Sequence, residues 1–312
     1  MDPRTELPDL PEPLPGPVVD THCHLDITSE FSGLAVHDAL ERAASVGVTR
    51  IVQIGCDVQQ STWAVDLART QPSVVAGVAL HPNDAARLGL TSRGDLDDGL
   101  AVIAELATYD RVRVVGETGL DFFRTPDAAG QALQRESFAA HIDFAKANGK
   151  TLVIHDRDAH DAVLDVLDAE GVPDRVVMHC FSGDETFARA CLDRGAHLSF
   201  AGTVTFKANV HLRRALAVTP LDRVLVETDA PFLTPEPLRG RPNASYLIPT
   251  TVRAVAAVRG MPLAELCRAL DENADAALGG SWPSYGDPRH SDHGHTDHQH
   301  GDDPDSSHRP SA

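Results

Sequence analysis

The sequence predicts a (β/α)₈ TIM barrel followed by a disordered C-terminal tail. Eight short apolar runs alternate with stretches of helical periodicity, as parallel βαβ units do. The 312 residues suit a barrel of about 250 residues with a segment at each end. Only 5% of residues are aromatic against 42% hydrophobic in all, so the core must consist mainly of Val, Leu, Ile and Ala, as in helices packed on parallel strands.

The apolar runs are rich in β-branched residues, and each ends at a polar residue or a glycine, as buried strands do. The predicted strands are Val18–Asp20, Ile51–Gly55, Val74–Leu80, Val112–Gly116, Thr151–Ile154, Val176–Met178, His197–Phe200 and Val224–Glu227. The predicted helices are Ala35–Val46, Ser61–Thr70, Leu96–Tyr109, Gln131–Asn148, Ala159–Glu170, Thr186–Arg194, Val210–Ala217, Ile248–Arg259 and Leu263–Leu270, with a last turn at Asn273–Ala277. A doubly wound open sheet is the competing fold, but it usually has a glycine-rich phosphate loop after its first strand, which is missing here.

Composition divides the chain into three parts. Residues 1–16 are a proline-rich lead, residues 17–279 are the barrel, and residues 280–312 are the predicted disordered tail. The last part is rich in His, Asp, Ser, Gly and Pro and has no periodicity. Six of the 16 histidines fall in residues 281–312, so weak metal binding by a His-rich tract is the alternative to a solvated acidic tail.

The formal net charge is -19, of which residues 281–312 contribute -4 through six Asp and two Arg. About -15 remains on residues 1–280, which argues against a broad DNA-binding surface but not against a small metal site that handles phosphate. The five cysteines are odd in number and form no C-x-x-C pair, which is typical of reduced thiols. Because no signal peptide or membrane-length apolar run is present, we expect a cytoplasmic protein without membrane contact. We also expect it to be a monomer.

Metal-binding side chains follow the predicted strands at their C-terminal ends, where a barrel of this class carries its active site. His22 and His24 follow strand one, and alternate residues of an extended segment point the same way, so the pair can bind one ion. The remaining residues at this rim are His81 after strand three, Glu117 after strand four, His155 after strand five, His179 after strand six and Asp229 after strand eight.

Four of these histidines and two carboxylates exceed what one tetrahedral zinc with an open position needs. The set suits two divalent cations with a bridging carboxylate, a pair that activates water and stabilises the attacking and leaving oxygens. Mixed nitrogen and oxygen ligands suit Zn, Mn, Co or Ni, and hydrated Mg less well. The predicted ligands are His22, His24, Glu117, His155, His179 and Asp229.

From about Val18 to Leu278 the sequence resembles TatD-type metal-dependent deoxyribonucleases, within the amidohydrolase-like (β/α)₈ barrels. The chain departs from the pattern of the family at Thr118 and at Asn243-Ala244-Ser245. The motifs that carry the resemblance are Asp20-Thr21-His22-Cys23-His24-Leu25-Asp26, Gly116-Glu117-Thr118-Gly119-Leu120-Asp121, His155-Asp156-Arg157, His179-Cys180-Phe181-Ser182-Gly183, Glu227-Thr228-Asp229-Ala230-Pro231 and Arg239-Gly240-Arg241-Pro242-Asn243.

The resemblance implies a role for each rim residue. His22, His24 and Asp229 would hold one metal, His155 and His179 the second, and Glu117 would bridge them. Asp229 would also act as general base towards the attacking water. His81 and Arg157 would line the pocket and contact the scissile group, and Arg239 would contact substrate phosphate. Many related barrels use a carboxylated lysine as the bridge, but Lys146, Lys150 and Lys207 all lie away from the end of strand four.

The leading functional hypothesis, taken from the resemblance, is a DNA phosphodiesterase of the 3′-exodeoxyribonuclease type. The alternative is a hydrolase of another ester or amide, for example an aminoacyl-tRNA deacylase, because one barrel supports many chemistries. Phosphate substrates would need cations at the pocket, and Arg157, Lys207, Arg239 and Arg241 are placed to supply them. The remote alternative is a non-enzymatic metal buffer built on the tail. Deleting residues 281–312 would abolish most metal binding by such a buffer but leave an enzyme nearly intact.

Overall fold

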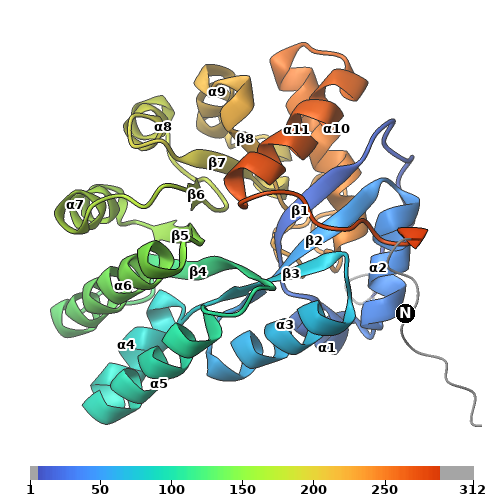
Figure 1. The fold of residues 1–312 in the computed structure, drawn as a ribbon. Helices are drawn as coiled ribbons and strands as arrows, with labels where there is room; N and C mark the ends of the chain where they lie inside the picture. The colour runs from blue at the N-terminus through green and yellow to red at the C-terminus, as the bar shows by residue number, and fades with distance from the viewer. Residues whose placement is uncertain (1–5, 289–312) are drawn as a thin grey trace, which may run out of the picture.

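Eight parallel strands, paired in chain order, form one sheet that curls into a barrel with helices around it (Figure 1). The computed structural model describes residues 6–288 and confirms the predicted (β/α)₈ fold. The strands are β1 (Val18–Cys23), β2 (Val48–Gly55), β3 (Val74–Val78), β4 (Val112–Asp121), β5 (Thr151–Arg157), β6 (Val176–Met178), β7 (His197–Phe200) and β8 (Val224–Val226). The α-helices are α1 (Leu25–Ser32), α2 (Val36–Ser45), α3 (Val58–Thr70), α4 (Pro82–Thr91), α5 (Arg93–Leu106), α6 (Ala128–Asn148), α7 (His160–Glu170), α8 (Glu185–Leu192), α9 (Val210–Val218), α10 (Ile248–Arg259) and α11 (Leu263–Ala277).

The structure adds two helices that the sequence analysis missed, α1 and α4, and merges the last two predicted segments into α11. Asp271 and Asp275 lie within α11, and both carboxylates accept hydrogen bonds from the buried Arg50. These polar residues interrupt the apolar periodicity but not the helix. Three strands also run further than their apolar stretches, so that His22, Glu117 and His155 lie within β1, β4 and β5 rather than after them.

Two apolar layers account for the barrel. Side chains that point outwards pack against the helices, whereas a smaller cluster fills the interior of the barrel. This alternation follows from the two-residue repeat of a strand. The inner cluster is Val19, Val52, Ile54, Val75, Val114, Val153, Val177 and Leu225, closed at one end by Ala274, Ala277, Leu278 and Trp282.

Strands β1 and β4 change face just before the polar residues begin. Between Asp20 and Cys23, β1 advances three residues while β2 advances two. Between Val115 and Thr118, β4 likewise advances three residues against two in β5. One extra residue reverses which face the following side chains occupy. As a result, two side chains three residues apart both face into the barrel in each strand. They are Val19 and His22 in β1, and Val114 and Glu117 in β4.

The barrel closes between β1 and β8 without a regular ladder among the described residues. Two backbone bonds join the end of β1 to the segment after β8, from the Asp229 N–H to the His22 carbonyl and from the His24 N–H to the Ala230 carbonyl, both 2.9 Å. The buried Asp20 carboxylate accepts from the N–H and the hydroxyl of Thr228 at 2.9 and 2.6 Å. The closure therefore lies beside the predicted metal ligands.

The folded part of the chain extends past the predicted barrel boundary at residue 279. Trp282 is only 5% exposed and donates from its indole nitrogen to the Ser73 carbonyl at 2.9 Å. The Tyr285 N–H reaches the Thr49 carbonyl at 2.8 Å, and the segment crosses the end of the barrel towards α2 (Figure 1). The predicted tail therefore begins no earlier than the end of this packed segment, and the rest of it lies outside the described residues.

The proline-rich lead also contacts the barrel. The Tyr246 hydroxyl donates to the Pro8 carbonyl at 2.7 Å, and the Leu14 N–H donates to the Val46 carbonyl at 3.0 Å. Residues 1–5 of the lead lie outside the described part. Across residues 6–288, the structure contains no helix that is both long and apolar enough to span a bilayer.

A buried histidine makes the stability of the fold depend on pH. His141, on α6, accepts a hydrogen bond from the Leu80 N–H through Nε2 at 3.0 Å and contacts the Ser137 carbonyl through Nδ1 at 2.6 Å. Because Nε2 acts as an acceptor, these contacts favour the neutral ring. Burial lowers the pKa of His141 from 6.5 to about 4. The unfolded chain thus binds the proton first, and stability is full above pH 6.5 and is lost as the pH falls towards 4.

We expect this titration to cost roughly 3 kcal/mol of unfolding free energy by pH 4, at about 1.4 kcal/mol per pKa unit. Denaturant unfolding of the wild type and of His141→Gln between pH 4 and 7 measures it. The variant should be less stable at pH 7 but should change less with pH. Equal slopes for the two proteins would contradict the assignment.

Candidate metal centre at the carboxyl end of the barrel

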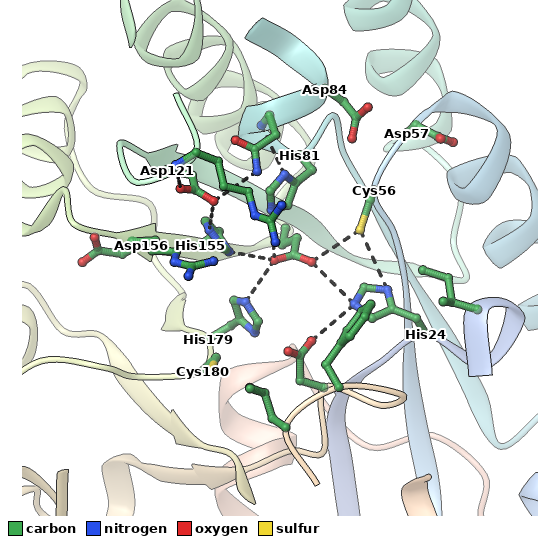
Figure 2. A pocket seen from close by; sticks show the side chains of 18 of the residues that line it. His24, Cys56, Asp57, His81, Asp84, Asp121, His155, Asp156, His179 and Cys180 are labelled. Carbon is green, nitrogen blue, oxygen red and sulfur yellow. Dashed lines mark hydrogen bonds and ion pairs between the residues drawn. The ribbon is translucent and has the colours of Figure 1, made fainter. Parts of the chain in front are cut away.

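A pocket of about 590 Å³ opens at the carboxyl ends of the strands (Figure 2). Its walls include His24, His81, Glu117, His155, His179, Asp229 and Arg157, which are all residues singled out from the sequence. His22 lies immediately beneath, with its ring stacked on that of His179 at 3.9 Å between centroids. The structure therefore brings all six predicted ligands together, from β1, β4 and β5 and from the segments after β1, β6 and β8.

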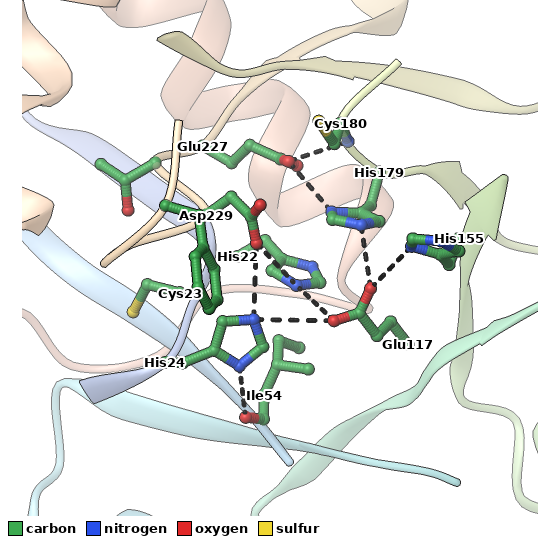
Figure 3. A network of polar contacts seen from close by, with 12 residues as sticks. His22, Cys23, His24, Ile54, Glu117, His155, His179, Cys180, Glu227 and Asp229 are labelled. Carbon is green, nitrogen blue, oxygen red and sulfur yellow. Dashed lines mark hydrogen bonds and ion pairs between the residues drawn. The ribbon is translucent and has the colours of Figure 1, made fainter. Parts of the chain in front are cut away.

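Glu117 is the hub of this cluster (Figure 3). Its Oε1 lies 3.5 Å from His22 Nε2 and 3.6 Å from His24 Nε2. Its Oε2 lies 3.0 Å from His179 Nε2 and 3.2 Å from His155 Nδ1. One carboxylate thus presents a different oxygen to each of two histidine pairs, which is the arrangement that a bridging ligand requires.

Asp229 completes the first pair. Its Oδ1 lies 3.4 Å from His24 Nε2 and 3.8 Å from His22 Nε2. The backbone of Asp229 has a φ of 55°, in the left-handed region, which aspartate tolerates better than most residues. This conformation is fixed by its N–H bond to the His22 carbonyl, so the turn after β8 holds the carboxylate against β1.

Two carboxylates that the sequence analysis did not assign hold the second pair. Glu227 is fully buried, and its Oε1 accepts from the Cys180 N–H at 2.8 Å and contacts His179 Nδ1 at 3.0 Å. Asp121 Oδ2 lies 3.3 Å from His155 Nε2. Such partners orient the rings of metal-binding histidines. Both residues lie at buried strands, within motifs described in the sequence analysis. This position was the signal in the sequence that could have identified them.

The ionisation of the cluster favours a bound cation. Burial would raise the pKa of Glu117, but the surrounding histidines, His179 and His22 foremost, hold it well below its ordinary value. Burial and repulsion from His179 lower the pKa of His22. The attraction of Glu117 and Glu227 outweighs burial and raises the pKa of His179 well above its ordinary value. A buried cluster of carboxylates and histidines of this kind would also attract a metal cation, which competes with protons for the same groups.

The donor set fits divalent metal ions. Both ring nitrogens of His22 are buried without a hydrogen-bond partner in the described chain, so nothing in the protein uses the lone pair that a neutral imidazole offers. Several groups of three donors lie close enough to share an ion, including His22 with Glu117 and His179, and His22 with His24 and Asp229. Imidazole and carboxylate together suit zinc and its first-row neighbours.

His81 stands at the wall of the pocket with a defined ring orientation. Its Nδ1 accepts from the Asn83 N–H at 3.2 Å as the N-cap of α4, so in the neutral ring the proton lies on Nε2. Nε2 lies 3.9 Å from Glu117 Oε2. Burial and repulsion from His155 lower the pKa of His81 to about 3, which keeps the ring neutral. His81 therefore offers an N–H donor at the site.

The basic residues proposed for phosphate contact are placed unequally. Arg157 lines the pocket, with its guanidinium 4.0 Å from the ring centre of Phe123. Arg239 is outside the pocket lining, where it stacks on Phe206 at 4.2 Å. Arg241 bonds the carbonyls of residues 6 and 7 and so serves the lead segment, which corrects its expected place at the pocket. Lys207 is exposed and also lies outside the lining, whereas Arg124 lies within it.

Cys56 is a further pocket residue that the sequence analysis treated as an ordinary thiol. Its sulfur lies 3.4 Å from Glu117 Oε1 and 3.8 Å from His24 Nδ1 (Figure 2). Cys180 also borders the pocket, whereas Cys23, Cys191 and Cys267 are buried elsewhere. Burial raises the pKa of the Cys56 thiol well above its ordinary value, so the neutral thiol donates to the hub carboxylate.

Residues 19–279 match the family model described as TatD related DNase. The metal-dependent hydrolase TatD of Mycobacterium tuberculosis is 43% identical over 268 residues, covering 85% of this chain and 99% of the relative. YabD of Bacillus subtilis, also named a metal-dependent hydrolase, is 34% identical over 257 residues, covering 82% and 96%. The crystal structure of YjjV, a TatD homologue from Escherichia coli, superposes with a TM-score of 0.76 at 26% identity, covering 85% and 98%.

Proposed function

The chain belongs to the TatD-related DNase family of metal-dependent hydrolases, and from this premise we propose that it cleaves phosphodiester bonds of DNA, as a 3′-exodeoxyribonuclease. The observation that carries the proposal is the hub geometry of Glu117, whose two oxygens face two separate histidine pairs. Two ions held in this way suit in-line displacement at phosphorus.

We assign His22, His24 and Asp229 to one cation, His155 and His179 to the other, and Glu117 to both. When bound, two divalent cations would supply Lewis acidity towards the phosphoryl oxygens and would make an attacking water more acidic. Glu227 and Asp121 are positioning residues in this scheme. Each contacts the ring nitrogen of a histidine that does not face Glu117.

The side chains of the pocket would then divide the remaining work. Asp229 is 14% exposed at the side chain, more than Glu117, the other carboxylate near His22 and His24, and would accept the proton of the attacking water. His81 would donate from Nε2 to an oxygen of the scissile phosphate, and Arg157 would pair with that phosphate. Arg239 would contact a phosphate further from the reacting group.

The direct test is an assay on end-labelled single-stranded DNA with Mn- or Mg-loaded protein, alongside Asp229→Ala. Stepwise shortening from the 3′ end by the wild type, lost in the variant, is expected. Metal content is measured on both proteins. If the wild type carries its metal and leaves the DNA intact, the substrate moves to another ester or to an amide, such as an aminoacyl-tRNA, while the site assignment stands.

His81→Ala tests the donor role separately from metal binding. We expect the variant to retain the metal content of the wild type and to lose about 10²–10³-fold in kcat, the usual effect of removing one preorganised donor. His81→Gln, which keeps an N–H group, should recover part of the loss. A His81→Ala protein that turns over at the wild-type rate would remove His81 from the mechanism.

A further inference from the structure

A second polar hollow, of about 140 Å³, lies at the opposite end of the barrel from the metal centre. Three cations line it from consecutive strands. Arg113 stands at the start of β4, Lys150 immediately precedes β5, and Arg175 immediately precedes β6. Gly279, just after α11, lies close against Arg175, since a Cβ on it would come within 3.2 Å of the guanidinium. Four separate segments therefore meet around the hollow.

Within residues 6–288 none of the three cations has an ion pair with a carboxylate, although the chain carries a net charge of -19. Neutral acceptors hold them instead. Arg113 donates to the Gly279 carbonyl at 2.6 Å, Lys150 to the Tyr109 carbonyl at 3.1 Å, and Arg175 to the Thr151 hydroxyl at 3.3 Å and the Gly149 carbonyl. These bonds use only part of the donors that the three side chains carry.

The charge of the hollow is uncompensated by its own lining. Asp110 is the single carboxylate there, so three cations and one anion leave a net charge of +2. Burial and repulsion from Arg113 and Arg175 outweigh the attraction of Asp110 and lower the pKa of Lys150. Cations that are held in place by neutral acceptors and repel one another form a site whose charge an anion can neutralise.

We propose that this hollow binds one phosphate-class oxyanion through Arg113, Lys150 and Arg175. A phosphate dianion matches the net charge of +2, and guanidinium groups suit the geometry of its oxygens. The small volume admits one tetrahedral anion, supplied either as free phosphate or as a phosphate of a nucleic-acid backbone. The bound anion would tie the starts of β4, β5 and β6 to the segment after α11, and so would stabilise this end of the barrel.

Phosphate binding and thermal unfolding of the metal-loaded protein test the proposal. The midpoint should rise with the logarithm of inorganic phosphate at constant ionic strength. Glu117→Ala should keep this response, because the hollow is remote from the metal centre. Lys150→Gln and Arg113→Gln, prepared separately, should each bind phosphate at least about tenfold more weakly. Arg268→Gln, which removes an exposed cation elsewhere, is the matched control and should respond as the wild type does.

Two results would overturn the proposal: chloride raises the midpoint as much as phosphate does, or both hollow variants respond like Arg268→Gln. A response that disappears in Glu117→Ala also contradicts it, since the anion would then bind at the metal centre. Binding of a short single-stranded oligonucleotide to Glu117→Ala, with and without Lys150→Gln, identifies the source. An unchanged affinity assigns the site to free phosphate, and a weakened one assigns it to backbone phosphate.

Discussion

Glu117→Ala should purify with neither metal ion and should hydrolyse substrate at least about 1,000-fold more slowly than the wild type, because several kcal/mol of transition-state stabilisation depend on the two ions. The two oxygens of Glu117 face both histidine pairs, and its side chain is 6% exposed, so its loss removes a ligand from both ions. Elemental analysis of the purified protein and an assay under metal saturation measure the two losses.

Asp121→Asn is the matched comparison, since Asp121 contacts only His155 among the predicted ligands. It should weaken the binding of one ion and leave the other in place. Glu117→Gln keeps the shape but not the charge and should resemble Glu117→Ala. If Glu117→Ala retained the full metal content of the wild type, the bridging role would be wrong, whatever happened to its activity.

A chain that ends at Gly280 should lose about 3–5 kcal/mol of unfolding free energy, the usual cost of removing a large buried aromatic side chain. Such a chain lacks Trp282, which closes the inner core and stacks under Arg50 with 4.6 Å between guanidinium and ring centre. Arg50 would also lose its bond to the Ser281 hydroxyl and gain access to solvent.

Denaturant unfolding of two truncated chains measures this effect. The chain that ends at Pro288 keeps every described contact of Trp282 and should unfold close to the full-length protein. Trp282→Phe should lie between the two, because it fills most of the volume but leaves the Ser73 carbonyl without its donor. Equal stability of the chains ending at 280 and 288 would contradict the closing role of Trp282. From the sequence we expected the deletion of residues 281–312 to leave an enzyme nearly intact. This deletion removes Trp282 and therefore part of the folded core.

The strands and the rim residues could be predicted from the sequence because apolar runs and their polar ends are local signals. The residues that contact the rim residues and orient them could not be predicted. Glu227 and Asp121 were quoted within their motifs, yet only the fold shows which histidine each one contacts. Trp282 was missed because one aromatic residue among Gly, Ser and Pro makes no periodic pattern, and its burial depends on strands more than 200 residues away.

Whether His22 and Glu117 face into the barrel depends on the number of residues that precede them in the strand, not on their own chemistry. One extra residue in β1 and one in β4 set that count. Deleting either would turn the ligand that follows it out of the barrel, although the ligand itself would still be present in the sequence. When relatives of this chain are aligned, a one-position gap at either point is therefore better evidence of a dismantled metal centre than a conservative replacement of a ligand.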